Sequence, residues 1–448
     1  MIRIPATALA HACLALLCIA AAPAALAAGC LNEEPAEPKV GPASIAPADA
    51  ATSRKTLKDL VQAAIARSQA VGAATLLAEA AVSDVQEARA GRLPQASLSG
   101  ALNHVHFHTP GSAAEQGRQA QTSLNVGAPL YDAGRTSQLT TWRSHLAEAA
   151  LLGQMSAQEQ VALQTVSLAI DRNRYRLQSQ VYGQFARRLT CLVQALEQIV
   201  SADRGRTSEL VQARKNLQQA ELSQVQAQAA ARQVEVRLRR FVGDALPPLD
   251  GMSAQLIKVP DLNELLGNVP RASDIMQLEA QADAQESLAG VVALGNKPQV
   301  NWQLGTSQVN GVGRTGSWSA GVTYTVPLYS PGQGSATDAA RKRAQAARLQ
   351  YIEALESRKS RTTDVHDQAT SAFDRARKVC DVLRNSELVR NYTLQQWQQL
   401  GRRSLFDLMS AEGDHYSLRV SYVNAISDGQ LATALLYSLG QGVSGSLQ

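Results

Sequence analysis

Aromatic residues are scarce in this chain. Phe, Tyr and Trp make up only 4% of its 448 residues, while alanine, glutamine, leucine, serine and arginine dominate long stretches. So few large side chains cannot fill one thick core, and the composition predicts long helices packed in thin layers. The net charge of +5 is scattered along these stretches among acidic residues. That pattern is typical of solvated helix faces and argues against a nucleic-acid partner.

Long hydrophobic runs are missing after residue 30. No stretch of 18 or more apolar residues occurs there, so the mature chain is predicted to have no transmembrane helix. Residues 1–27 have the features of a secretory signal peptide: a basic start at Arg3, an apolar stretch, and a small-residue cleavage site at Ala25–Ala27. The alternative is a lipoprotein signal ending at residue 29, with Cys30 as the lipidated N-terminus. Either way the protein is predicted to be exported.

Cysteines and catalytic motifs are few. Cys191 and Cys380 remain in predicted helices, and their positions relative to the helix ends place them too far apart for a disulfide, so we expect both to be unpaired. There is no nucleophile elbow, phosphate loop, CxxC pair or HExxH helix, so we predict no enzyme and no cofactor. His104, His106 and His108 alternate on one face of a predicted strand, but no carboxylate or cysteine joins them, and we predict no metal site.

A short motif occurs twice and organises the chain. In each copy an alternating apolar and polar run reaches Pro-Leu-Tyr, at Pro129–Tyr131 and Pro327–Tyr329, and passes through a turn into a long helical segment. A partner strand precedes each copy. The four predicted strands are Gln95–His108, Gln121–Leu130, Gln299–Asn310 and Ser317–Leu328. They are uncharged and about ten residues long, as expected of tilted strands that cross a bilayer.

Helical segments surround the two strand pairs in the same order, so the chain is an internal duplication. Pro129 and Pro327 are 198 positions apart, and the helix-turn glycines Gly205 and Gly401 are 196 apart. A heptad seam in the first long helix consists of Phe185, Leu189, Leu192, Leu196 and Ile199. The predicted divisions are a signal peptide at 1–27, a disordered leader at 28–55, a first repeat at 56–243, a linker at 244–260, a second repeat at 261–440 and a tail at 441–448.

This order of motifs resembles that of the TolC-type outer-membrane efflux and secretion channels. The similar features are Leu-Pro-Gln at Leu93–Gln95, Pro-Leu-Tyr-Asp-x-Gly-Arg from Pro129, and Gly-x-x-Ser helix turns, and they cover residues 56–440. The resemblance implies a mostly α fold with a transmembrane β-barrel. Duplicated α-helical hairpins would form a tunnel, and four strands per protomer would build a twelve-stranded barrel in a homotrimer. The residues point the same way, because four strands cannot close a barrel and open edges are not tolerated in lipid.

The resemblance also implies a function. Such a channel exports cargo from an inner-membrane ABC or RND transporter and its periplasmic adaptor, across the periplasm and the outer-membrane lipid. The cargo is a polypeptide in type I secretion and a small molecule in multidrug efflux; the similarity of Gly401–Met409 to a type I exporter turn favours the first. The alternative is a periplasmic coiled-coil adaptor or structural protein. An adaptor would not need four uncharged strands, and residues 204–208 leave no room for its lipoyl-like domain.

The two helix turns are the candidate gate. In the family, carboxylates and tethering contacts close this end of the tunnel; Asp407 matches an acidic residue of the constriction and Arg403 a tethering arginine. This sequence departs from the family at Ser410, which replaces the second constriction carboxylate, and at Val211, which replaces an acidic partner and leaves Glu209 nearest. A ring of three Asp407 side chains would still attract cations. The candidate residues are Gly205, Arg206, Glu209, Gly401, Arg402, Arg403 and Asp407.

Overall fold

The computed structural model describes residues 47–108, 115–244, 246–247, 252, 255–400, 403–440 and 442–446. The predicted signal peptide and Cys30 lie outside these ranges, as do Gly401 and Arg402. The chain divides into two compact units. The strand unit consists of residues 69–158 and 267–360, and the turn unit of residues up to 68, 159–266 and 361 onward. Two long helices, α5 (Arg135–Ala202) and α9 (Gly332–Gln395), contribute residues to both.

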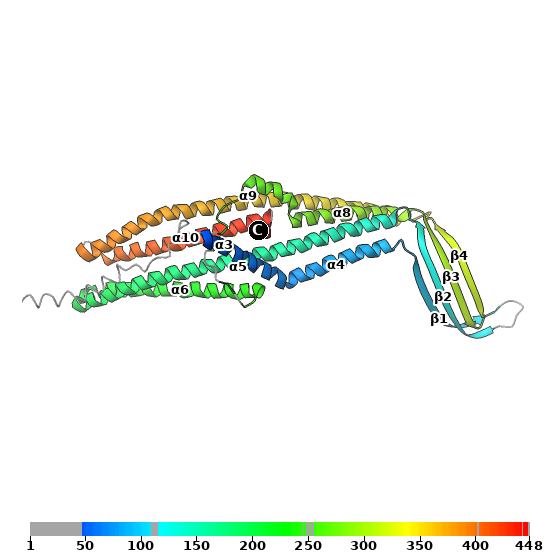
Figure 1. Ribbon diagram of the computed structural model, residues 1–448, viewed down its shortest axis with the longest axis horizontal. Helices are drawn as coiled ribbons and strands as arrows, with labels where there is room; N and C mark the ends of the chain where they lie inside the picture. Colours follow the sequence, from blue (N-terminus) through cyan, green and yellow to red (C-terminus); the bar gives the residue numbers. More distant parts are fainter. Residues whose placement is uncertain are drawn as a thin grey trace, which may run out of the picture. The chain divides into compact units, whose positions relative to one another are not determined.

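The strand unit contains one antiparallel sheet, in the order β1-β2-β3-β4 (Figure 1). Its strands are β1 (Gln95–Phe107), β2 (Glu115–Tyr131), β3 (Gln299–Gly311) and β4 (Thr315–Thr325). The four predicted strands are thus confirmed, and the largest differences in their bounds are at the start of β2 and the end of β4. β2 begins at Glu115, six residues earlier than expected, and β4 ends at Thr325, before Pro327, which cannot donate to a strand ladder.

The sheet has one apolar and one polar face, and its register aligns each kind of residue across the strands. One cross-strand row consists of Leu98, Leu124, Thr306 and Trp318. The next row, on the opposite face, consists of Ser99, Ser123, Ser307 and Ser317. The Ser123 and Ser307 hydroxyls are hydrogen bonded at 3.2 Å. The apolar face is exposed in the single chain: Trp318, Val322 and Tyr324 are each more than 60% accessible.

The helices of the strand unit follow the same lateral order as the strands. They are α4 (Gln69–Ala90), the first part of α5, α8 (Ser273–Ala293) and the first part of α9. The contacts that define this order are the ion pair Asp84–Arg143 (3.2 Å), the apolar cluster of Ala149, Leu152 and Ala280, and the ion pair Asp283–Arg348 (3.3 Å). The strand unit is therefore a single layer with two free lateral edges, one formed by β1 and α4 and the other by β4 and α9.

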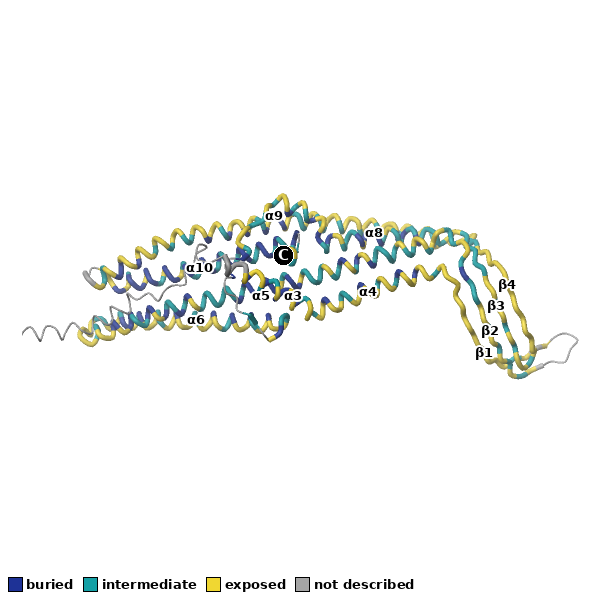
Figure 2. Tube along the Cα trace, viewed as in Figure 1, coloured by how far each residue is buried: buried dark blue, intermediate teal, exposed yellow. Residues whose placement is uncertain are grey.

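The turn unit is built from two helical hairpins. The first pairs α5 with α6 (Thr207–Val242), and the second pairs α9 with α10 (Leu405–Leu439). Shorter elements are α3 (Pro47–Arg67), which begins within the expected leader, α7 (Leu262–Asn268), a π-helical turn (Gln396–Leu400) and α11 (Val443–Ser446). Buried residues concentrate along α10 (Figure 2). α10 is therefore the central helix of this unit, and it contacts both α5 and α9.

Segments expected to be a linker and a tail pack within the turn unit. The buried amide of Gln430 donates to the carbonyl oxygens of Met252 (2.9 Å) and Gln255 (2.7 Å). The Glu159 carboxylate accepts hydrogen bonds from the Val443 amide and the Ser444 hydroxyl. Val443 is fully buried in a cluster with residues of α3 and α5.

Two sequence expectations concern single features. Among the described residues, no one helix has the length and hydropathy to span a membrane, although the bent pair Thr52–Arg67 and Gln69–Ala90 meets that test by length and composition. Of the two cysteines expected to be unpaired, Cys380 is free. The expectation is wrong for Cys191, which is disulfide-bonded. The spacing of Cys191 and Cys380 along their helices excludes only a disulfide between these two cysteines.

The junction between β2 and α5 depends on one carboxylate. Ala133 and Gly134 have φ values of 55° and 86°, a conformation that Gly adopts readily. The Asp132 carboxylate accepts hydrogen bonds from the amides of Gly134 (3.0 Å) and Thr136 (2.7 Å). Burial raises the pKa of Asp132, but these hydrogen bonds and the nearby Arg92 outweigh it and hold the pKa below its ordinary value.

We expect Asp132→Ala to cost about 1 kcal/mol at neutral pH, the usual effect of removing a helix cap. Because the folded-state pKa is lowered, the stabilisation is complete above the unfolded value, near 4, and is lost as the pH falls through the folded value. Thermal unfolding of both proteins from pH 7 to pH 3 checks this. A stability difference that does not shrink in acid would contradict the assigned role of the carboxylate.

Candidate gate at the helix turns

The first helix turn is closed by its own side chains. Asp203 precedes a short 3-10 turn (Arg204–Arg206), and its carboxylate accepts a hydrogen bond from the Gly205 amide at 2.9 Å. Arg206 and Glu209 form an ion pair at 2.8 Å, one helical turn apart. The structure thus brings these two candidate residues together, within a single turn. Gly205 lies against Asp203, and an added Cβ would meet the carboxylate oxygen at 3.1 Å.

The second helix turn is closed by a capping box. The Ser404 hydroxyl accepts from the Asp407 amide (3.1 Å), and the Asp407 carboxylate accepts from the Ser404 amide (3.3 Å). Arg403 lies beside this box, 3.8 Å from the Asp407 carboxylate and hydrogen bonded to Gln396 at 3.1 Å. Asp407 therefore has a structural role at the start of α10, while its side chain stays 43% exposed.

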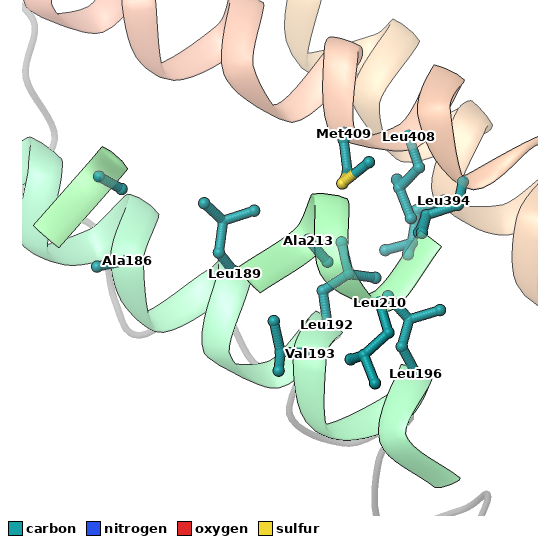
Figure 3. Packing of buried hydrophobic residues seen from close by; sticks show 12 residues of the cluster. Ala186, Leu189, Leu192, Val193, Leu196, Leu210, Ala213, Leu394, Leu408 and Met409 are labelled. Carbon is teal, nitrogen blue, oxygen red and sulfur yellow. The ribbon is translucent and has the colours of Figure 1, made fainter. Parts of the chain in front are cut away.

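An apolar cluster joins the two turns (Figure 3). All five residues of the predicted heptad seam of α5 pack in this cluster. The same cluster buries Leu210, which is next to Glu209 in sequence. It also buries Leu405 and Leu408, which lie on either side of Asp407. The charged residues of both turns are thus held in place by a single apolar cluster beneath them.

A buried ion pair lies further along the same helices. Arg188 on α5 and Glu412 on α10 are 3.1 Å apart, and their side chains are only 9% and 3% exposed. Phe185 stacks on the Tyr416 ring with centroids 4.8 Å apart, and the Arg419 guanidinium lies 5.4 Å from the same ring. Burial raises the pKa of Tyr416, and the Glu412 charge adds to this effect. These contacts connect α10 to α5 through groups that are costly to separate.

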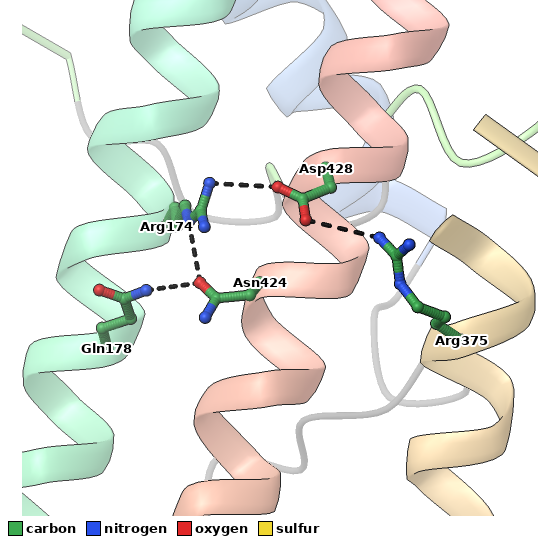
Figure 4. A network of polar contacts seen from close by, with 5 residues as sticks. All are labelled: Arg174, Gln178, Arg375, Asn424 and Asp428. Carbon is green, nitrogen blue, oxygen red and sulfur yellow. Dashed lines mark hydrogen bonds and ion pairs between the residues drawn. The ribbon is translucent and has the colours of Figure 1, made fainter. Parts of the chain in front are cut away.

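A second polar network connects three helices (Figure 4). On α10, the Asp428 carboxylate binds Arg174 of α5 at 3.2 Å and Arg375 of α9 at 3.7 Å. Asn424, one turn earlier on α10, accepts hydrogen bonds from Arg174 (2.9 Å) and Gln178 (2.6 Å). Asp428 therefore holds the second hairpin together and attaches it to the first.

A further carboxylate lies close to this network. Asp171 on α5 has a raised pKa because it is partly buried and the Asp428 charge is near, while Arg174 and Arg237 act in the opposite direction. The charge of Arg174 thus acts on Asp171 as well as on Asp428, which it binds directly.

Sequence reasoning did not find these two networks. Glu412, His415 and Arg419 are buried on the face of α10 that also carries Leu405 and Leu408. The available signal for a buried polar network was the presence of polar residues at positions where the helical periodicity calls for apolar ones. The partners on α5, however, lie more than 220 positions away in sequence.

No group of three or more His, Cys, Asp or Glu side chains suited to a metal ion occurs within the ranges that the structure describes. His104 and His106 are exposed near the far end of β1, opposite Arg118 and Gln116 of β2. They share the apolar face of the sheet with Leu98 and Leu102, as the alternation predicted.

Known outer-membrane channels have this fold. CusC, described for transmembrane channel formation, matches with a TM-score of 0.77 and 18% identity over 86% of this chain and 92% of its own. The outer membrane protein VceC from Vibrio cholerae matches with a TM-score of 0.76 and 17% identity over 87% and 97%. For the outer-membrane channel OprN the TM-score is 0.77 at 18% identity, over 87% and 91%. The TolC-type fold predicted from the sequence is therefore confirmed. No protein-family model and no curated protein matches the sequence.

Proposed function

We propose that this protein is a homotrimeric outer-membrane channel that exports cargo and catalyses no reaction. The sheet carries this proposal. One face presents exposed Leu98, Trp318 and Val322, whereas the other presents a row of serine hydroxyls. Such a sheet suits a barrel wall with lipid outside and water inside. A periplasmic adaptor would have no use for it.

The free edges of the strand unit support the trimer. The outer edges of β1 and β4 have unpaired backbone groups, which lipid does not tolerate. β1 and β4 run in opposite directions, so β4 of one copy can pair with β1 of the next and continue the antiparallel pattern. Three copies then close a barrel of twelve strands, an even number like other bacterial barrels.

The partners follow from the same architecture. The helix turns form the periplasmic end of a tunnel and receive cargo from an inner-membrane ABC or RND transporter through an adaptor. Between an unfolded polypeptide and small molecules as cargo, the residues around Arg403 and Asp407 favour a polypeptide, because their sequence is similar to the turn of type I exporters. Transport energy comes from the partner.

Conductance tests the function directly. Detergent-extracted protein placed in planar bilayers is expected to give discrete channels, and chemical cross-linking is expected to give a ladder that ends at the trimer. Soluble, non-conducting protein would overturn the channel proposal and favour the periplasmic adaptor.

Asp407 is proposed to act at the gate as well as in the capping box. Asp407→Asn removes three charges from the trimer and keeps a hydrogen-bond acceptor, so we expect altered single-channel conductance and weaker cation selectivity. Ser404→Ala is the matched control: it breaks the capping box, costs about 1 kcal/mol in stability and leaves the conductance unchanged. Identical traces for the Asp407 variant and the native protein would remove Asp407 from the gate.

A further inference from the structure

Four nitrogen-bearing side chains lie together at one end of the sheet, on its apolar face. His104 and His106 are on β1, and Arg118 and Gln116 lie opposite them on β2 in register. All four side chains are exposed. They lie at the end of the sheet that is away from α4 and α8 (Figure 1). We call these four residues the rim cluster.

The rim cluster has an excess of hydrogen-bond donors. His104 is directly opposite Arg118, and the Cβ atoms of such cross-strand partners are about 4.5–5.5 Å apart. A guanidinium group has five N–H donors and no acceptor. In the part of the chain that the structure describes, no residue forms an ion pair or a side-chain hydrogen bond with Arg118. Glu115, the one acidic residue of the four strands, is paired in register with Phe107. The cluster thus fits an anionic partner that accepts hydrogen bonds.

The length of the apolar face sets the height of the rim cluster in the proposed barrel. On β2 this face extends from Leu130 to Ala120, which are ten positions apart. At about 3.4 Å per residue and a tilt of about 40°, ten positions rise about 26 Å, close to the height of about 25 Å of the apolar band of such barrels. Arg118 is the next position on this face, about 5 Å further. It therefore lies at the level of the lipid headgroups.

The β3–β4 turn holds the backbone at this end of β2. The Val312 amide donates a hydrogen bond to the Arg118 carbonyl oxygen at 3.4 Å, and the Gln119 side-chain amide donates to the Val312 carbonyl oxygen at 3.2 Å. Gly311 has a φ of 101°, and a Cβ added there would clash with the Arg118 carbonyl oxygen. These contacts fix the backbone that carries the Arg118 side chain.

We propose that the rim cluster binds the phosphate groups of lipid headgroups in the outward-facing half of the membrane. The assignment rests on the proposed channel, which places the apolar face in lipid and the helix turns in the periplasm. An arginine can bind a phosphate through two parallel hydrogen bonds, and the N–H groups of His104 and His106 can reach its other oxygens. A lipid fits better than free phosphate because its acyl chains can lie along the adjoining apolar face, on Leu98 and Leu102, which are 73% and 77% exposed.

Lipid binding by the purified full-length protein tests this site. The probe is lipid A, a lipid with two phosphate groups, titrated into the protein in detergent micelles. EDTA is present so that no divalent cation bridges the phosphates and the protein. Arg118→Gln is expected to raise the dissociation constant about fivefold, the usual effect of one basic residue at an anionic lipid surface. An unchanged dissociation constant would overturn the site.

Two variants that each add one arginine provide the matched control. Gln116→Arg places a second guanidinium in the rim cluster, opposite His106, and should tighten lipid A binding by a similar factor. Asn103→Arg adds the same charge on the polar face, opposite Gln119, and should leave lipid A binding unchanged. An equal gain in both variants would show that net charge alone attracts the lipid, and the site would then be wrong.

Inorganic phosphate and conductance separate the remaining outcomes. Inorganic phosphate at the same concentration as lipid A is expected not to displace it; displacement would overturn the lipid assignment in favour of free phosphate. Weaker lipid binding by Arg118→Gln in a trimer that still conducts in planar bilayers supports the site. Unchanged binding in a conducting trimer would overturn the site and leave the channel intact. Native protein that is soluble and non-conducting would overturn both.

Discussion

Val322→Arg is expected to abolish trimer assembly. Val322 lies near the middle of β4 on the exposed apolar face, and its cross-strand partner is Trp302 of β3. In the assembled barrel an arginine here would face the hydrocarbon core of the bilayer, at a cost of about 2–4 kcal/mol per chain. Three chains share one barrel, so the cost is multiplied in the trimer. Heat-resistant trimers on a denaturing gel, compared with the native protein, provide the measurement.

Ser319→Arg is the matched control for this prediction. Ser319 lies on the same strand, three positions away and on the polar face, in the row with Ser97 and Asn125. A charge on the lumen side of a barrel changes conductance more than assembly. The same defect in both variants would contradict the assignment of the two faces. Leu124→Arg on β2 should reproduce the effect of Val322→Arg.

Glu412→Gln is expected to have the largest effect on the stability of the turn unit. The change keeps the volume of the side chain but leaves Arg188 as a buried charge that has lost its anion. Removing one partner of a buried ion pair costs about 3–5 kcal/mol. Thermal unfolding of the detergent-solubilised protein should show this as a lowered transition temperature.

Glu197→Gln is the comparison for the buried pair. Glu197 binds Arg214 at 2.7 Å between α5 and α6, but both side chains are about half exposed. Solvent-exposed pairs contribute about 0–1 kcal/mol, so this variant should unfold almost like the native protein. A loss in Glu412→Gln no greater than in Glu197→Gln would show that Arg188 finds another partner.

Much of the fold could be predicted because its signals are local. The alternation of apolar and polar residues predicted all four strands, and the heptad spacing from Phe185 to Ile199 predicted the packed face of α5. The early start of β2 was missed because Glu115 and Arg118 carry charges. They belong to the polar end of the sheet, where Arg118 lies opposite His104.

The environment of the candidate gate was only partly accessible from the sequence. Asp407 and Arg403 lie together at the second turn, as their spacing of four positions allows. The ion pairs of Arg188 and Asp428 were not foreseeable in the same way, because their partners come from other helices and periodicity does not say which faces meet. Packing, rather than local propensity, selects those partners.

The two ion pairs that attach α10 to α5 have a mechanical consequence. Glu412 and Asp428 bind this helix to α5 at two levels, about 24 Å apart at 1.5 Å per residue, so neither hairpin can tilt alone without breaking ion pairs, of which the Glu412 pair is buried. In the proposed trimer, the turn unit of each protomer would then move as one rigid body. Widening the tunnel would enlarge the three equal gaps between protomers, and the opening would stay centred on the threefold axis at every stage.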